Sequence, residues 1–73
     1  MTDSAFMLST LRLFPKGATT MQIIQRSLVT RGYGITPHSR AADLRRKGYT
    51  IHCDRVATHR GRPVYEYRLG DES

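Results

Sequence analysis

Apolar residues recur at helical spacing near the start of the chain. Met7, Leu11 and Phe14 stand at positions i, i+4 and i+7, so they share one face of a helix. The acid and the serine at positions 3 and 4 can cap the start of this helix, and the Pro-Lys-Gly at 15–17 ends it. We therefore expect a first helix that begins at residue 3 or 4 and runs through about Phe14.

A second helix is predicted where Met21, Ile24 and Leu28 repeat the same kind of spacing. Residues 18 and 19 before it are expected to form a short extended connector. The threonine at 19 or 20 can cap the helix by accepting a hydrogen bond from a backbone amide. The Arg-Gly-Tyr-Gly at 31–34 is too rich in glycine to continue the helix, so it predicts a turn.

A third helix is delimited at both ends. Thr36 can cap its start, Pro37 fixes φ at the first helical position, and Gly48 tolerates the left-handed conformation in which helices commonly stop. Ala41 and Leu44 are its clear apolar positions. This small apolar side should lie close against the other two helices, which leaves the rest of a helix of about three turns exposed.

Two strands with alternating polarity complete the pattern. The apolar face of the first consists of Tyr49, Ile51 and Cys53, and that of the second consists of Tyr65, Tyr67 and Leu69. The segment 58–63 between them contains glycine and proline, as turns do. We therefore expect an α+β protein in which three helices precede a two-stranded β-hairpin. A single domain should span residues 1–73, with an ordered core of about 4–69 and a short frayed tail from Gly70.

Size and composition narrow the function classes. Chains of about 73 residues bury only about 60% of their unfolded surface, so a catalytic cleft is hard to build on this scale. The single cysteine, Cys53, suits a reducing compartment, and no apolar run is long enough to cross a membrane. His38, His52 and His59 lack the short paired spacing of zinc motifs. We expect a cytoplasmic protein that is not an enzyme and uses no metal or other cofactor.

Positive charge is concentrated in one part of the sequence. The chain carries 12 basic and 6 acidic residues, a net charge of +6. Residues 31–62 hold eight of the basic and two of the acidic residues, whereas residues 63–73 are net acidic. A localised basic field attracts polyanions, so we expect the third helix and the hairpin to bind double-stranded DNA. Solubility and binding to an acidic protein surface are the alternative explanations.

The junction between the third helix and the first strand resembles a known family. The segment Arg40-x-x-Asp43-Leu44-Arg45-x-x-Gly48-Tyr49-x-Ile51, with Tyr67-Arg68-Leu69 after a basic turn, is similar to the small winged helix-turn-helix domains of bacteriophages and prophages. The likeness covers roughly residues 8–69, and it departs at Ala41, where the family more often carries a larger aliphatic residue. The resemblance implies a winged-helix fold, a role in DNA binding or transcription, and the cytoplasm of a bacterial host.

A helical wheel assigns candidate contacts on the third helix. With Ala41 and Leu44 turned inward, the opposite face holds the candidate base-facing residues Ser39, Ala42, Asp43 and Arg46. The candidate phosphate-binding residues lie on the flanks, Arg40 and Lys47 on one side and His38 and Arg45 on the other. Arg46 is best suited to guanine, because its guanidinium matches the O6 and N7 acceptors together. The alternative is a solvated face on which Asp43 pairs with Arg40, Arg46 or Lys47.

The basic turn between the strands supplies a second set of candidates. His59, Arg60 and Arg62 are placed to enter a minor groove or to follow the phosphate backbone. A disordered loop whose charge serves only solubility is the alternative. Tyr65 and Tyr67 are expected to belong to the wall of the core.

These observations predict a sequence-specific or structural DNA-binding protein that acts as a small transcription or recombination accessory factor. The third helix would enter the major groove, and the hairpin would be a basic wing. The alternative is a protein-interaction winged helix that docks on host transcription machinery such as RNA polymerase. Exposed Ile23 and Val29 on the second helix would favour that alternative.

Overall fold

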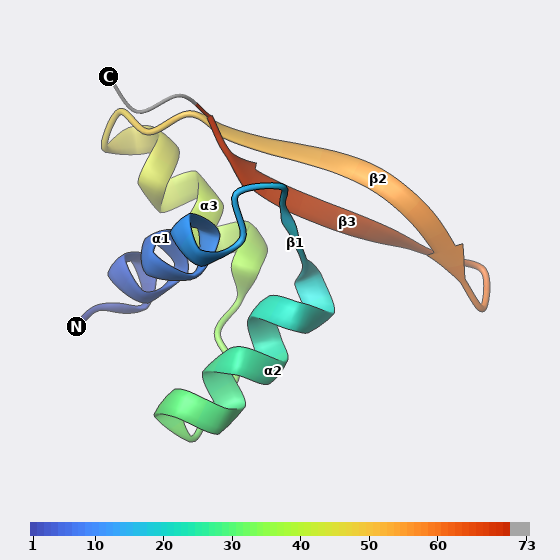
Figure 1. Cartoon of the computed structure of the whole chain (residues 1–73), viewed down its shortest axis with the longest axis horizontal. Coiled ribbons are helices and arrows are strands. Elements are labelled where there is room, and N and C mark those ends of the chain that lie inside the picture. The colour runs from blue at the N-terminus through green and yellow to red at the C-terminus, as the bar shows by residue number, and fades with distance from the viewer. Residues whose placement is uncertain (71–73) are drawn as a thin grey trace.

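The computed structural model describes residues 1–70 and contains three helices and a three-stranded antiparallel sheet (Figure 1). The elements follow the order α1 (Asp3–Leu13), β1 (Ala18–Thr19), α2 (Thr20–Arg31), α3 (Pro37–Arg46), β2 (Ile51–His59) and β3 (Arg62–Leu69). The hairpin of β2 and β3 projects to one side, well beyond the helices (Figure 1). The expected α+β class is confirmed, but the expected number of strands is wrong.

The additional strand is β1, in the segment that the sequence predicts as a connector. It pairs with β3, with Ala18 opposite Tyr67 and Thr19 opposite Glu66, so the strand order is β1-β3-β2. Gly17 permits the close approach, because its φ is +114° and a Cβ there would lie 2.6 Å from the Glu66 side chain. A strand of two residues is too short to show an alternation of apolar and polar positions, so β1 could not be predicted from the sequence. It forms because this segment packs beside β3.

The helix starts agree only in part with the sequence prediction. Thr2, not residue 3 or 4, caps α1, since its side-chain oxygen accepts a hydrogen bond from the amide of Ala5 at 3.1 Å. Thr19 caps α2 as expected and forms a capping box with Gln22. Thr36 occupies the N-cap position of α3, but its side chain makes no capping hydrogen bond.

The ends of α3 are close to the prediction. Pro37 lies in its first turn, and the helix ends at Arg46, two residues before Gly48 at φ +99°. Gly70, expected to begin a frayed tail, donates its amide to the carbonyl of Thr50 at 2.7 Å. The rest of that tail, residues 71–73, lies outside the described residues.

The inward face of α2 differs from the predicted stripe. Ile23 and Ser27 are fully buried, whereas Met21 and Leu28 are exposed. The Ser27 hydroxyl donates to the carbonyl of Ile24 at 2.7 Å and accepts from the amide of Ile35 at 3.1 Å. A small polar residue can thus belong to the core when its hydrogen bonds are satisfied. A search for apolar residues at helical spacing passes over such a residue.

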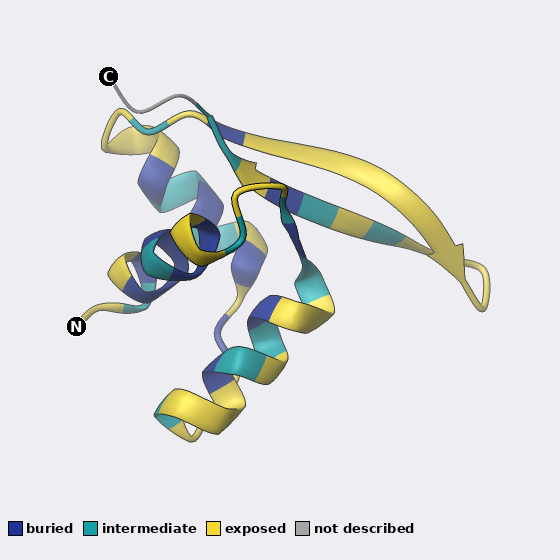
Figure 2. Ribbon diagram, viewed as in Figure 1, coloured by how far each residue is buried: buried dark blue, intermediate teal, exposed yellow. Residues whose placement is uncertain are grey.

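The core lies where the helices meet the near end of the sheet, as the buried positions in Figure 2 show. Its members are Phe6, Met7, Leu8, Leu11, Ala18, Ile23, Ile35, Ala41, Leu44, Ile51 and Tyr67. Cys53 and Tyr65, placed on the core face by the alternation, are instead exposed. Cys53 lies on the edge strand β2, opposite the buried Tyr67, and Tyr65 lines an open groove between the helices and the sheet, so neither side chain is fully covered.

The hairpin is longer and its turn is tighter than expected. β2 begins at Ile51 rather than Tyr49, and β3 begins at Arg62, directly opposite His59. The turn therefore consists of Arg60 and Gly61, whose φ values of 52° and 77° are both positive, as type I′ hairpin turns require. A register shift lies between Arg55 and Ala57 and bends the exposed ribbon.

Candidate nucleic-acid interface

The third helix turns Ala41 and Leu44 inward as the wheel predicts, but of the four residues predicted on the opposite face only Arg46 is exposed. Ala41 and Leu44 are 0% and 2% exposed, and Ser39 and Ala42 are half-buried. His38, Arg45, Arg46 and Lys47 are exposed. The helix therefore offers a basic surface, and the contacts of each charged residue decide how much of it is available to a ligand.

Asp43 draws two of the candidate arginines toward the protein. Its carboxylate pairs with Arg40 at 3.2 Å and with Arg46, and it accepts a hydrogen bond from the hydroxyl of Ser4 in α1 at 3.1 Å. The hydrogen bond from Arg46 lowers the pKa of Asp43 below its ordinary value, with Ser4 and the charge of Arg40 acting the same way against partial desolvation. Asp43 thus joins α3 to α1 instead of standing free as a base-facing residue.

Arg46 nevertheless stays accessible. Its side chain is 75% exposed while it pairs with Asp43. Exposed ion pairs of this kind contribute about 0–1 kcal/mol, so a phosphate or a guanine edge can compete for the guanidinium.

Arg45 has a structural task that the sequence prediction missed. Its Nε and Nη2 atoms donate to the carbonyl of Ile51 at 3.1 and 2.7 Å. This bidentate contact ties α3 to the start of β2 and so sets where the hairpin begins relative to the helix. This contact could not be predicted from the sequence, because every residue has a backbone carbonyl and the type of residue does not show which one Arg45 contacts.

His38 lies beside an open groove between the helices and the sheet. The groove measures about 460 Å³ and is lined by Thr20, Ile24, Ile35, Thr36, Pro37, His38, Tyr65 and Tyr67. Tyr67 is 4% exposed, and burial followed by the neighbouring Cys53 thiol raises its pKa, so its hydroxyl stays protonated. Tyr65 is 41% exposed and offers an aromatic surface in this groove.

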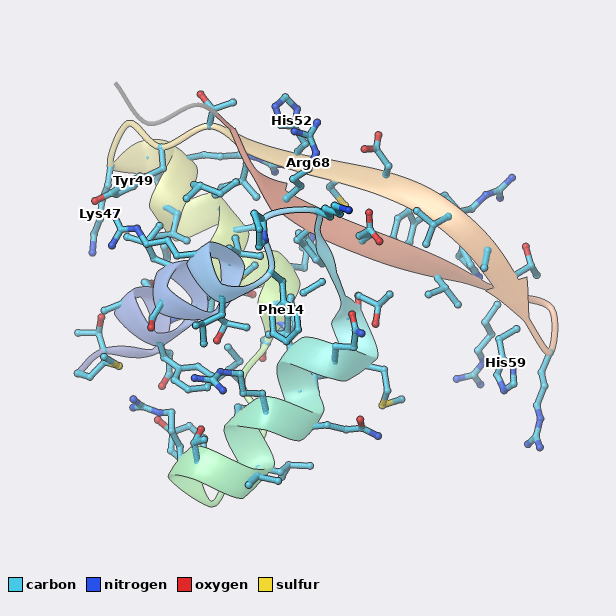
Figure 3. All side chains as sticks on the ribbon, viewed as in Figure 1. Phe14, Lys47, Tyr49, His52, His59 and Arg68 are labelled. Carbon is cyan, nitrogen blue, oxygen red and sulfur yellow. The ribbon has the colours of Figure 1, made fainter. Side chains whose placement is uncertain are left out.

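The hairpin turn holds the second set of candidates at the far end of the molecule. His59, Arg60 and Arg62 are exposed, and with Met21, Pro63 and Val64 they line a further groove of about 540 Å³. Figure 3 shows His59 at the opposite end of the molecule from Lys47, which follows α3. The two candidate sets therefore lie at opposite ends of the molecule and do not form a single cluster.

Arg55 is a candidate that sequence reasoning missed. It is exposed and lies opposite Tyr65 in the register of the hairpin, between the turn and α3. Within residues 1–70, no hydrogen bond or ion pair occupies the side chains of Lys47, Arg55, Arg60 or Arg62. The strand alternation could not have found it, because period two places position 55 on the same face as Ile51 and Cys53.

The remaining candidate residues do not form a common site. His52 lies beside Arg68 on the outer side of the sheet, far from His59 (Figure 3). No group of three or more potential metal ligands occurs in the described part of the chain. On α2, Val29 is 85% exposed but Ile23 is fully buried, so Ile23 is not available for docking.

None of the helices described here is both long and apolar enough to span a bilayer. Comparison of the chain with known protein families, curated proteins and solved structures found no match.

Proposed function

We propose that this chain is a double-stranded DNA-binding protein of winged-helix type. The turn between α2 and α3 completes a helix-turn-helix, α3 enters the major groove, and the hairpin of β2 and β3 is the wing. The order of three helices before a terminal hairpin supports this assignment. In this proposal the protein is a small transcription or recombination accessory factor of phage type that acts in the bacterial cytoplasm.

The observation that carries the proposal is a set of cations at the end of α3 and on the hairpin that have no ion-pair partner among residues 1–70. Lys47, Arg55, Arg60 and Arg62 keep their charge available, because no carboxylate of residues 1–70 neutralises them. The molecule is 36 Å along its longest axis, and one turn of B-DNA rises about 34 Å. The helix and the hairpin turn can therefore reach neighbouring grooves of one duplex.

Salt dependence tests this proposal. If the four unpaired cations meet phosphates, log affinity should fall linearly with log salt concentration with a slope of about −3 to −4, since each neutralised phosphate contributes about −0.9. Fluorescence anisotropy with a random-sequence duplex at several salt concentrations measures the slope. Polyglutamate of matched charge is the competitor that probes the alternative.

Two results would contradict the proposal. One is duplex binding that does not respond to salt, because phosphate contacts require such a response. The other is displacement of the duplex by polyglutamate at equal charge concentration, which would identify the basic surface as a site for acidic proteins. With a confirmed affinity, selection from random duplexes would then show whether a preferred sequence exists.

A further inference from the structure

A groove between the end of α1 and the outer side of α2 lies apart from the proposed DNA surface. It measures about 340 Å³ and is lined by Phe14, Gln22, Gln25, Arg26, Val29 and Thr30. None of these residues lines the groove beside His38 or the groove at the hairpin turn. A partner in this groove would therefore leave α3 and the hairpin free.

The walls of the groove combine apolar surface with hydrogen-bond donors. Val29 is 85% exposed, and Phe14 packs only partly against the core. An apolar side chain as exposed as Val29 gains free energy when a partner covers it. The amides of Gln22 and Gln25 stand beside these apolar side chains.

Arg26 adds a positive charge to the groove. Its guanidinium lies 5.7 Å from the centre of the Phe6 ring, its Nε atom is buried, and that atom has no hydrogen-bond partner. No ion pair joins Arg26 to a carboxylate within residues 1–70. The guanidinium therefore keeps unused hydrogen-bonding capacity, and a carboxylate supplied by a partner would be a favourable acceptor for it.

We propose that this groove binds an amphipathic helical segment of another protein that carries aliphatic anchors beside a carboxylate. The anchors would contact Phe14 and Val29, and the carboxylate would meet the guanidinium of Arg26, as in helix-in-groove recognition. A second copy of the chain is a poor occupant, because each copy has a net charge of +6 and pairing α2 with α2 brings two Arg26 side chains together. A DNA strand is a poor occupant as well, because the groove offers one cation between apolar walls.

A pair of synthetic peptides tests the proposal. Each has about 12 residues, which matches the length of α2 at 1.5 Å per residue, with leucines at helical spacing. One carries glutamates at the remaining positions, and its twin carries lysines. The glutamate peptide should shift the amide signals of Phe14, Gln22, Gln25 and Val29 in NMR spectra of the labelled chain, and the lysine peptide should not.

Three variants sharpen the test. Arg26→Gln should weaken the glutamate peptide by about tenfold, as expected for the loss of a charge-assisted hydrogen bond. Val29→Glu should abolish peptide binding and leave duplex binding intact. Because Val29 is exposed, this variant should keep the fold, so it still tests the groove if Arg26→Gln is unstable. Val56→Glu, at an exposed position on the hairpin, makes the same change in net charge and should leave peptide binding unaltered.

Three outcomes would overturn the proposal. The two peptides could bind equally, which would remove the role of charge. The shifts could map onto α3 and the hairpin, which would reveal only general attraction of anions to a basic chain. Sedimentation could show a dimer that Val29→Glu dissociates, which would make the occupant a second copy. Failure of duplex binding would affect none of these readouts, because the peptide groove shares no residue with the DNA surface.

Discussion

Asp43 shows how one residue can serve both the fold and the proposed interface. It pairs with Arg40 and Arg46 of α3 and accepts a hydrogen bond from Ser4 of α1. Its charge opposes the approach of a phosphate, yet it orients the arginines that would receive one. The same carboxylate therefore affects stability and DNA affinity.

The lowered pKa of Asp43 predicts a stability effect with a definite pH dependence. Its ordinary value is 3.8 and the folded value is lower, so the ionised carboxylate stabilises the fold above the unfolded pKa, and this contribution is lost as the pH falls through the folded pKa. Asp43→Asn should melt at a lower temperature than the natural chain at about pH 6, and the difference should shrink toward about pH 2. Thermal melts followed by circular dichroism would measure it. A difference that does not change with pH would contradict this role.

Arg46 and Arg60 should respond differently to truncation. In the proposed complex Arg46 reads a base, so Arg46→Ala should cost about 1–3 kcal/mol at a preferred site and little elsewhere. Arg60, in the hairpin turn, would contact only phosphate, and Arg60→Ala should weaken all duplexes alike and reduce the salt slope by about one contact. Anisotropy titrations with a selected site and a scrambled site separate the two effects. Equal losses on both duplexes for both variants would remove the base-reading role of Arg46.

At the scale of the elements, a few hydrogen bonds set how the helices and the hairpin are joined. Ser27 of α2 receives the amide of Ile35 just before α3 begins, and Arg45 of α3 holds the carbonyl of Ile51 at the start of β2. Both contacts fix a junction between consecutive elements. The orientation of α3 between α2 and the hairpin therefore depends on two polar side chains as well as on the apolar core.

Ser27→Ala should destabilise the chain by about 1–3 kcal/mol, because the amide of Ile35 would be left buried without a partner. The matched control is Thr30→Ala in the same helix, whose exposed hydroxyl donates to the carbonyl of Arg26. This control should change stability by no more than about 0.5 kcal/mol. Urea denaturation of both variants gives the comparison. Equal stabilities for the two variants would show that water replaces the Ser27 hydroxyl.

At the scale of the whole molecule, the structure separates a packed body from an exposed ribbon. The core lies among the helices and the near end of the sheet, while residues 52–63 are all exposed (Figure 2). Stability should come from the body. The ribbon adds exposed positive charge that lies away from the packed body.

This separation predicts that the far part of the hairpin can be removed without unfolding the protein. Replacement of residues 56–64 by an Asn-Gly turn deletes only exposed or half-buried residues and keeps Arg55 opposite Tyr65. The melting temperature should change by no more than about 4 °C. The salt slope of duplex binding should fall by about two, since Arg60 and Arg62 are lost. Loss of cooperative melting would show that the ribbon is part of the folding unit.

Local sequence was sufficient for the parts of the fold that local physics controls. Apolar spacing, Thr19, Pro37 and Gly48 predicted three helices near their observed limits, and alternation with Gly61 predicted a hairpin. These signals act within a few residues of each other, through backbone φ, capping and side-chain periodicity. The uneven charge of residues 31–62 also follows from composition and needs no structure.

Contacts between distant residues decided the rest. β1 exists because Ala18 meets Tyr67, and Asp43 lies against α1 because Ser4 reaches it. The buried face of α2 includes Ser27 because its hydroxyl serves Ile35. In each case the partner is remote in the sequence or is a backbone group without a residue signature, so only the tertiary structure shows which charges remain free to meet a ligand.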